Sequence, residues 1–430
     1  MSAPPWLELT AAADAPFAWC AGRPISRAEF ARSAATLAAA LPSAPFFINR
    51  CASRYRFALA FAAVALRDAV SLLPSAAGEG AITAIQSQYP AALVLDDAGV
   101  QSLLNGSLRS FVRRDLCPAT QSVAIAFTSG STGEPQACVK SWRLLAMSAH
   151  YCRLQVGGGR GFNVVATVPP QHMFGLETTI ATALAAGWAF FEGPSFFPAQ
   201  IVAALDSLPR PRMLITSPFH LRHLLASGLR LPAVDVVLTA TAPLTAELAR
   251  AAENRCCALV QEIYGCSEAG SLATRRTAHD SHFTPYPDVV FSVHGERAAV
   301  TAAHMTDTVT LADRLDLRAD GRFQLLGRDA DMIKVAGRRA SLADITRKLT
   351  SLPGVQDAVV FAPDGADNAR PAALVVAPGQ TEANLRAALA RLLDPIFVPR
   401  PIRLVAALPR NALGKLPRAE LLAMLAVSRD

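Results

Sequence analysis

One nine-residue stretch, residues 127–135, restricts the possible folds of this chain more than any other, and it reads Phe-Thr-Ser-Gly-Ser-Thr-Gly-Glu-Pro. The apolar run 123–127 is typical of a short buried strand, so the residues after it are expected at a strand end. Gly130 and Gly133 can adopt positive φ, which lets backbone N–H groups converge. The hydroxyl donors beside them are Thr128, Ser129, Ser131 and Thr132. These features predict an anion-binding turn, and an ordinary surface loop is the alternative.

Strand and helix patterns alternate around this stretch. Strands are predicted at residues 45–49, 70–74 and 91–97, and a helix at residues 55–69. Ser26 is expected to cap another helix that runs through Leu41, with Glu29 at the capping-box position. The alternation predicts a mostly parallel sheet covered by helices. From residue 332 onward, short strands and two helices at 342–349 and 382–393 predict a smaller α+β unit.

Length and composition set further limits. A chain of 430 residues is too long for one core of ordinary size. The longest apolar run, from Phe57 to Leu66, is too short to span a bilayer. The first residues lack the pattern of a secretory signal and the eight cysteines lack metal spacing, so a cytoplasmic location is expected. The net charge of +7 suits anionic partners such as ATP or CoA, although a basic surface that aids solubility is the favoured explanation of the charge alone.

Three more stretches occur in the order known from one family. They are residues 264–268 (Tyr-Gly-Cys-Ser-Glu), Asp313 with the pair Gly327-Arg328, and residues 411–418 (Asn-Ala-Leu-Gly-Lys-Leu-Pro-Arg). With these motifs the chain resembles the adenylate-forming superfamily of acyl- and aryl-CoA synthetases, luciferases and peptide-synthetase adenylation domains. The resemblance covers almost the whole chain. It implies an α/β fold with a large N-terminal domain of helix-covered, mostly parallel sheets and a small mobile α+β C-terminal domain.

The same resemblance implies the domain boundaries. Residues 1–328 would form the domain that binds ATP and the acid, residues 329–331 the hinge, and residues 332–430 a lid with the catalytic lysine. In the hinge, Ala330 stands where relatives commonly have aspartate or lysine. The region of Gly337 would approach the pantetheine tunnel when the lid rotates for the second half-reaction, and Arg339 would be positioned for phosphate contact in that motion.

The nucleotide-binding roles also follow from the resemblance. The 128–133 loop would hold the departing pyrophosphate. Tyr264, followed by Gly265, would stack on or near adenine, and Ser267 stands for the usual threonine at the α-phosphate. Glu268 would hold Mg²⁺. Asp313 has the spacing from Arg328 of the family's ribose-binding aspartate, and the two would form a clamp suited to ribose.

Two residues are implied to be catalytic. Lys415 would bridge the carboxylate and α-phosphate oxygens as charge builds on them. His172 follows the proline pair 169–170 and resembles the histidine that closes over the carboxylate pocket in acyl-activating relatives. A histidine that is simply a satisfied core or surface residue is the alternative. The aspartate that holds an amino group in peptide-synthetase domains has no counterpart here, so an amino-acid substrate is disfavoured. The resemblance to acyl- and aryl-CoA synthetases implies a fatty or aromatic acid.

The expected reaction activates this carboxylic acid with ATP and transfers the acyl group to a thiol. The acceptor is CoA or the phosphopantetheine of an acyl carrier protein, with CoA preferred, and no nucleic-acid partner is expected. Departures from the family pattern are Gln136 in place of a lysine, with Lys140 four residues later, Ala312 in place of a glycine, and the pair Ala240-Thr241 in place of two glycines. Two alternatives remain: an adenylating enzyme with a non-thiol acceptor, and a catalytically degenerate ligand-binding or scaffold protein.

Overall fold

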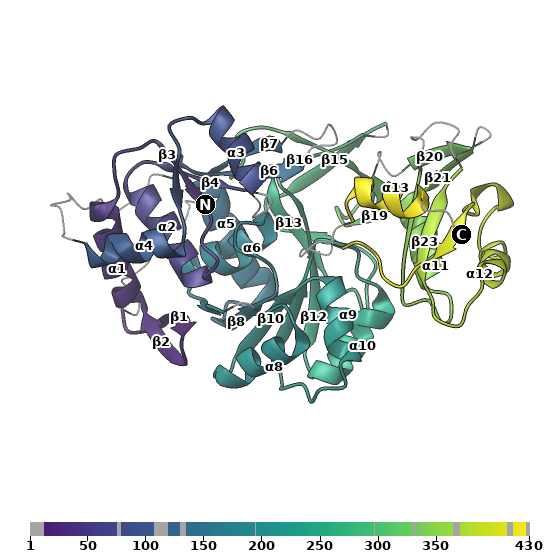
Figure 1. Cartoon of the computed structure of the whole chain (residues 1–430), viewed down its shortest axis with the longest axis horizontal. Coiled ribbons are helices and arrows are strands. Elements are labelled where there is room, and N and C mark those ends of the chain that lie inside the picture. Colours follow the sequence, from purple (N-terminus) through teal and green to yellow (C-terminus); the bar gives the residue numbers. More distant parts are fainter. Residues whose placement is uncertain are drawn as a thin grey trace. The chain divides into compact units, whose positions relative to one another are not determined.

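The computed structural model describes residues 13–74, 79–106, 119–129, 135–193, 195–295, 297–328, 332–335, 338–363, 370–410 and 416–426. Contacts between residues divide the chain into two compact units, which are described separately (Figure 1). The first unit comprises residues 1–290 and 301–309, and the second comprises residues 291–300 and 310–430. In the described part of the chain, no helix combines the length and the apolar composition needed to cross a bilayer.

The first unit contains a nine-stranded sheet in the order β14-β13-β12-β11-β10-β8-β9-β1-β2. Its strands are β1 (Pro16–Cys20), β2 (Arg23–Ser26), β8 (Asn163–Ala166), β9 (Ala189–Phe191), β10 (Arg212–Thr216), β11 (Val236–Thr239), β12 (Leu259–Cys266), β13 (Gly270–Arg275) and β14 (Thr284–Pro285). The six strands from β12 to β1 are mutually parallel, and the pairs at the two margins are antiparallel. The segments that follow β8, β10, β11 and β12 therefore emerge at one edge of the sheet.

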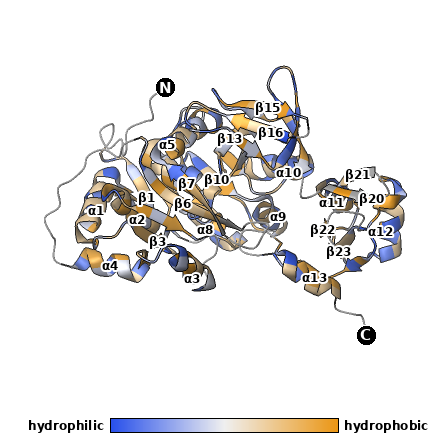
Figure 2. Cartoon of the chain, turned by 90° about the horizontal axis from the view of Figure 1, so that it is seen from above, coloured by the Kyte–Doolittle hydropathy of each residue, from blue (hydrophilic) through white to orange (hydrophobic). Residues whose placement is uncertain are grey.

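Helices cover both faces of this sheet, which explains its nearly continuous apolar strands. Alternate residues belong to different layers, because successive side chains of a strand point to opposite faces. Val165, Leu214 and Val237 pack with α8 (Pro198–Ser207), α9 (Pro218–Ala226) and α10 (Ala246–Cys256). Val164 and Met213 belong to the other layer, with α5 (Trp142–Tyr151). Figure 2 shows hydrophobic residues concentrated in strands such as β6 and β10 and hydrophilic residues on outer helices such as α12.

A five-stranded sheet completes the first unit, in the order β5-β3-β4-β6-β7. Its strands are β3 (Phe46–Asn49), β4 (Val70–Leu73), β5 (Leu93–Leu95), β6 (Ser122–Ser129) and β7 (Pro135–Ser141), and its helices are α1 (Arg27–Ala40), α2 (Arg54–Leu66), α3 (Glu79–Gln88) and α4 (Asp97–Asn105). All neighbours are parallel except β6 and β7. The Glu29 N–H donates to the Ser26 hydroxyl over 3.1 Å, so the predicted helix start is confirmed. Helix α2 ends at Leu66, three residues before its predicted end, because Asp68 adopts a positive φ of 55°.

The second unit is built from small sheets. Its strands are β15 (Val290–His294), β16 (Arg297–Thr301), β17 (Val309–Leu311), β18 (Asp313–Leu317), β19 (Phe323–Arg328), β20 (Met332–Val335), β21 (Arg338–Ser341), β22 (Asp357–Phe361), β23 (Ala372–Val376) and β24 (Ile402–Leu404). Its helices are α11 (Leu342–Thr350), α12 (Glu382–Leu389) and α13 (Arg418–Ala426). Ile345, Leu349 and Leu385 pack on the β22-β23-β24 sheet, so the predicted α+β plan is confirmed. The predicted hinge at 329–331 lies outside the described residues.

Candidate active site

The hairpin of β12 and β13 presents most of the described candidate residues. Glu262 pairs with Arg275 at its base, Tyr264 pairs with Ala273, and Cys266 pairs with Gly270 next to the tip. A register irregularity lies between Tyr264 and Gly265, where the hairpin bends away from regular pairing. The Tyr264 ring is buried at 6% exposure, 5.7 Å from the Phe283 ring. Ser267 is half-buried and Glu268 is exposed, and both follow β12 at the carboxyl edge of the sheet.

Glycine is required at two positions of this hairpin. A Cβ atom on Gly265 would lie 2.3 Å from the Gly270 carbonyl oxygen, because the two strands approach closely there. Gly270 has a φ of +76°, and a Cβ atom on it would lie 2.4 Å from the Glu177 Oε1 atom. The backbone of the tip therefore lies directly against the side chain of Glu177.

Two buried charged residues from other elements bind this tip. Lys140, on β7, is fully buried, and its Nζ donates to the Glu268 backbone carbonyl over 3.0 Å. Glu177, on the π-helix η2 (Leu176–Ala181), is 2% exposed and accepts the Ser271 N–H over 3.1 Å and the Ser271 hydroxyl over 2.6 Å. Burial lowers the pKa of Lys140, and Glu177 is among the nearby acids that oppose this shift. Burial likewise raises the pKa of Glu177, against the effect of its hydrogen bonds and of Lys140.

The base of the hairpin is closed by its own side chains. The Glu262 carboxylate forms an ion pair with Arg275 at 2.7 Å and accepts the Thr277 hydroxyl at 2.6 Å. It also accepts the Leu244 N–H at 3.1 Å, which ties the loop after β11 to the hairpin. In that loop Thr241 adopts a φ of +78°, an unusual conformation for a β-branched residue, where relatives were expected to have glycine.

His172 follows strand β8 at the same sheet edge. It precedes the short helix α6 (Met173–Gly175), and its N–H donates to the Pro169 carbonyl over 3.2 Å while its carbonyl accepts the Leu176 N–H over 2.8 Å. A Cβ atom on Gly175 would lie 2.1 Å from the Pro169 carbonyl oxygen, so this tight turn depends on glycine. The turn leaves His172 half-buried.

The loop that the sequence predicts to bind phosphate follows β6 in the chain. Thr128 pairs with Gln136 and Ser129 with Pro135 in the antiparallel ladder of β6 and β7. Gly130, Ser131, Thr132 and Gly133 lie outside the described residues, and their roles stay predictions. Lys140, near the far end of β7, makes the described hydrogen bond between this five-stranded sheet and the β12–β13 hairpin.

In the second unit, Asp313 and Arg328 are direct partners on β18 and β19. The two predicted residues therefore lie opposite each other on neighbouring antiparallel strands. Gly327, next to Arg328, adopts a φ of +124°. Arg339 pairs with Lys334 on β20 and β21. Three further predicted residues, Ala330, Gly337 and Lys415, lie outside the described residues.

A magnesium ion fits the donor that the hairpin tip offers. Among the described residues, no group of three or more histidine, cysteine, aspartate or glutamate side chains could hold a metal. The exposed Glu268 carboxylate supplies hard oxygen donors of the kind that Mg²⁺ prefers. Mg²⁺ is commonly held by one or two carboxylates together with substrate phosphates. The chain therefore suits a metal that arrives with a nucleotide.

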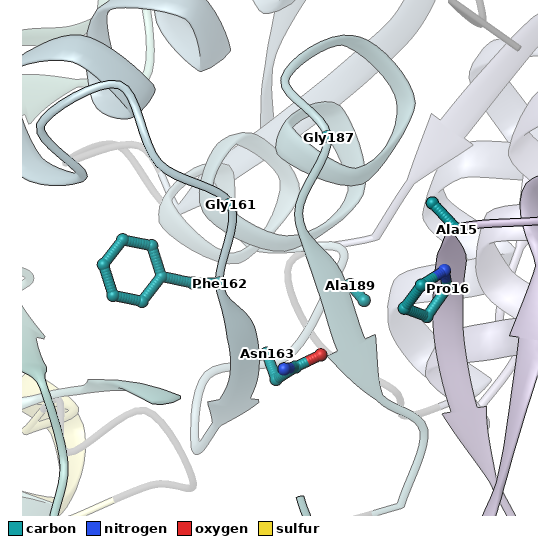
Figure 3. A pocket seen from close by; sticks show the side chains of 7 residues that line it. All are labelled: Ala15, Pro16, Gly161, Phe162, Asn163, Gly187 and Ala189. Atoms are coloured by element: carbon teal, nitrogen blue, oxygen red, sulfur yellow. The ribbon is translucent and has the colours of Figure 1, made fainter. Parts of the chain in front are cut away.

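A cavity of about 150 Å³ lies at the opposite edge of the large sheet (Figure 3). It is lined by Ala15, Pro16, Gly161, Phe162, Asn163, Gly187 and Ala189, at the starts of β1, β8 and β9. Asn163 is its only lining residue with a polar side chain, and that side chain accepts a hydrogen bond from Trp19 over 2.7 Å. With no titratable side chain in its lining, this cavity offers no catalytic group.

The sequence analysis noted Lys140 only as the lysine that follows Gln136, and it did not identify Glu177. Each is the one charged residue of its segment, since Lys140 lies in strand β7 and Glu177 in the run 173–186. A charged side chain is rarely buried without a polar or charged partner. Two such residues of opposite sign could therefore have indicated buried charged groups with partners elsewhere in the chain.

The chain matches two protein-family models. AMP-binding enzyme matches residues 47–308, and AMP-binding enzyme C-terminal domain matches residues 346–415. The chain is also similar to a 4-coumarate--CoA ligase of Halorhodospira halophila, at 30% identity over 302 residues that cover 67% of this chain and 73% of the relative.

Two solved structures have the same fold. The crystal structure of ATP-bound MatB from Rhodopseudomonas palustris superposes with a TM-score of 0.80 and 20% identity, covering 96% of both chains. The O-succinylbenzoate coenzyme A synthetase MenE from Bacillus subtilis, in complex with AMP, superposes with a TM-score of 0.81 and 16% identity, covering 95% of this chain and 94% of the other. At these identities the similarity establishes the α/β fold, which agrees with the sequence prediction.

Proposed function

Because the chain belongs to the AMP-binding enzyme family, we propose that it performs that family's two half-reactions with the residues described above. It is an AMP-forming acid–CoA ligase, in which ATP converts a carboxylic acid into an acyl-adenylate and the acyl group then passes to a thiol. The membership inferred from the sequence motifs is thus confirmed. The observation that best supports the detailed site is the β12–β13 hairpin, whose tip presents Ser267 and Glu268 at the carboxyl edge of the large sheet.

The first half-reaction joins two anions, so the site must neutralise charge and align the attack. A carboxylate oxygen forms a bond to the α-phosphorus, and pyrophosphate leaves with the electron pair of the broken bond. We propose that the Ser267 hydroxyl donates to the α-phosphate and that Tyr264 lies against adenine. Bound magnesium supplies positive charge to the phosphate oxygens, and Glu268 would hold it. Lys415 would stabilise the charge that builds between carboxylate and phosphate.

The acid is proposed to be aromatic or fatty. The similarity to a 4-coumarate--CoA ligase makes an aromatic acid the first compound to test. His172, at the start of α6, is proposed to close over the carboxylate. Asp313 and Arg328, which pair across β18 and β19, are proposed to bind the ribose of ATP.

In the second half-reaction the thiol sulfur forms a bond to the acyl carbon, and AMP leaves. CoA is the proposed acceptor, and the phosphopantetheine of an acyl carrier protein is the alternative. The hinge around Ala330 would allow the rotation that brings Gly337 and Arg339 to this step. We propose the cytoplasm as the location, where ATP and CoA are both available.

Product analysis with and without CoA tests this proposal. The protein is incubated with ATP, Mg²⁺ and either 4-coumarate or a fatty acid, and AMP and acyl-CoA are quantified by chromatography. Equimolar AMP and acyl-CoA are expected with CoA present. AMP release that is unchanged by CoA would instead indicate a non-thiol acceptor. A complete lack of acid-dependent AMP would favour the degenerate ligand-binding alternative.

The variant Lys415→Ala tests the role of the lysine. Acyl-adenylate formation is expected to fall by roughly 100-fold or more, the scale of removing one such stabiliser. Thiolysis of a supplied acyl-adenylate should stay close to the parent rate, because that step builds no charge between carboxylate and phosphate. Equal slowing of both steps would contradict a lysine that acts in the first step alone.

A further inference from the structure

We propose that Lys140 and Glu177 are positioning residues for adenylation, a pair of buried anchors that fix the tip of the β12–β13 hairpin. The proposal rests on the proposed function, in which Glu268 holds magnesium. Lys140 binds the backbone carbonyl of Glu268 itself, and Glu177 binds both the N–H and the hydroxyl of Ser271. The tip is thus held at two points, three residues apart, by groups of opposite charge.

The anchors bind the backbone of the tip and the Ser271 hydroxyl, and their hydrogen bonds do not involve the Glu268 carboxylate. Because Lys140 occupies the carbonyl of Glu268, the carboxylate of the same residue stays exposed. On the other side, Gly270 lies so close to the Glu177 carboxylate that a side chain at this position would clash with it. Such contacts restrict the direction of the Glu268 side chain without competing for its oxygens.

Stability alone does not explain two charges in this position. Lys140 and Glu177 are 0% and 2% exposed, and removing such charges from water is costly. Apolar residues of similar volume commonly stabilise a core as well as or better than a buried ion pair. What the charged groups supply, and an apolar pair cannot, is directed hydrogen bonding to the segment from Glu268 to Ser271.

Lys140 also connects two parts of the proposed site. In the sequence, strand β7 follows the loop proposed to bind phosphate, and Lys140 lies near the end of this strand. Its hydrogen bond to Glu268 therefore relates the loop proposed for pyrophosphate to the residue proposed for magnesium. Relatives usually have a lysine where this chain has Gln136, but Lys140 is fully buried and cannot contact phosphate. It acts through Glu268 instead.

The variant Lys140→Met removes the donor and the charge and keeps an unbranched side chain that is shorter by one heavy atom. Two ligand-free measurements are made on the full chain: the melting temperature, and amide hydrogen exchange of the peptide covering residues 262–275. Binding of α,β-methylene-ATP is then measured by calorimetry with and without Mg²⁺. We expect faster exchange near the tip and an affinity with Mg²⁺ that is lower by about 10-fold or more, the scale for partners that orient a metal ligand. Binding without Mg²⁺ should change by less than about twofold.

Arg27→Met is the matched control. Arg27 is also a buried cation that donates to backbone carbonyls, those of Ala183 and Trp188, and neither of these residues belongs to the hairpin. The Arg27→Met variant should have a lower melting temperature, and the effect of Mg²⁺ on its nucleotide affinity should be the same as in the wild type. If Lys140→Met lowered this part no more than Arg27→Met did, the role of Lys140 would be structural only and the proposal would be wrong.

The double variant Lys140→Met with Glu177→Gln covers the case in which the single variant folds poorly. It leaves no unpaired buried charge, so its melting temperature should exceed that of Lys140→Met. Its Mg²⁺-dependent binding should stay weak, because both anchors are altered. Recovery of binding together with stability would overturn the proposal. Glu268→Gln distinguishes a failure of the proposed function from a failure of the anchor proposal. If this variant leaves Mg²⁺-dependent binding unchanged, the proposed metal role of Glu268 is wrong. If it weakens binding and the double variant does not, only the proposed role of Lys140 and Glu177 is wrong.

Discussion

The two ends of the β12–β13 hairpin are held in different ways. At the base, Glu262 and Arg275 are direct cross-strand partners and form an ion pair with each other at 2.7 Å. At the tip, the holding groups are Lys140 and Glu177, which come from other elements and bind mainly backbone atoms. The base therefore uses its own side chains for stability. At the tip, the Glu268 side chain is exposed, and groups from other elements bind the backbone and the Ser271 hydroxyl.

This difference predicts that stability and function can be changed separately along one hairpin. A substitution at the base should lower the free energy of unfolding and leave the magnesium requirement of the folded protein unchanged. A substitution at the tip should change the magnesium requirement and leave the free energy of unfolding nearly unchanged, except where the backbone itself is strained.

The largest effect is expected for Glu262→Ala at the base. Arg275 would lose its carboxylate partner while it is largely buried, and the Thr277 hydroxyl would lose its acceptor. We expect a loss of about 3–5 kcal/mol in the free energy of unfolding, measured by urea denaturation. Glu247→Ala, which removes an exposed partner of Arg250, should cost no more than about 1 kcal/mol. Similar losses for the two variants would mean that the base does not hold the hairpin.

Gly270→Ala should affect both properties, because Gly270 lies where the backbone meets Glu177. The left-handed conformation would cost about 1–2 kcal/mol, and the new Cβ would also push against the Glu177 carboxylate. Gly228→Ala is the control, since Gly228 has a similar φ of +71° and a Cβ atom added there would have no neighbour within 4 Å. Both variants should lose stability, but only Gly270→Ala should slow pyrophosphate exchange. Equal exchange rates would show that the contact with Glu177 is unimportant for function.

Glu268→Gln should change function with little change in stability. A neutral amide is a weaker ligand for a hard cation, so the Mg²⁺ concentration for half-maximal pyrophosphate exchange should rise by about tenfold. The melting temperature should be unchanged within error, because the side chain is exposed. An unchanged magnesium titration would show that Glu268 does not bind the metal. The proposed functional role of the hairpin tip would then be wrong.

The smallest effect concerns the pH dependence of stability. Burial raises the pKa of Glu177 in the folded protein, although Ser271, Ser148 and Lys140 oppose the shift. The folded state therefore binds this proton more tightly than the unfolded chain does, and stability falls as the pH rises from the ordinary pKa of glutamate through the raised value. The melting temperature of the wild type, relative to that of Glu177→Gln, should decrease across this range. An increase would mean that the folded protein favours the ionised carboxylate.

Local patterns predicted much of the fold. Ser26 and Glu29 marked a helix start that the structure has, and the apolar run 123–127 lies within β6. The order of the motifs identified the family, which fixed the two-part architecture beyond what periodicity could give. The family resemblance paired Asp313 with Arg328, and the two residues are opposed across β18 and β19.

Long-range contacts were beyond prediction. The bond from Lys140 to Glu268 joins residues 128 positions apart, and that from Ser271 to Glu177 joins residues 94 positions apart. No local pattern specifies such pairs, because they depend on how two sheets and a π-helix pack together. Thr241 illustrates a second limit: its positive φ is imposed by the loop after β11, against the preference of a β-branched residue.

Acid-dependent exchange of labelled pyrophosphate into ATP is the measurement that tests the central claim most directly. It reports acyl-adenylate formation without requiring the thiol, and it is run on the wild-type protein with Mg²⁺ over a panel of aromatic and fatty acids. We predict that exchange requires both an acid and Mg²⁺ and that one class of acid is clearly preferred. Exchange that is absent with every acid, or that proceeds equally well without one, would contradict the assignment of this chain as an acid-activating enzyme.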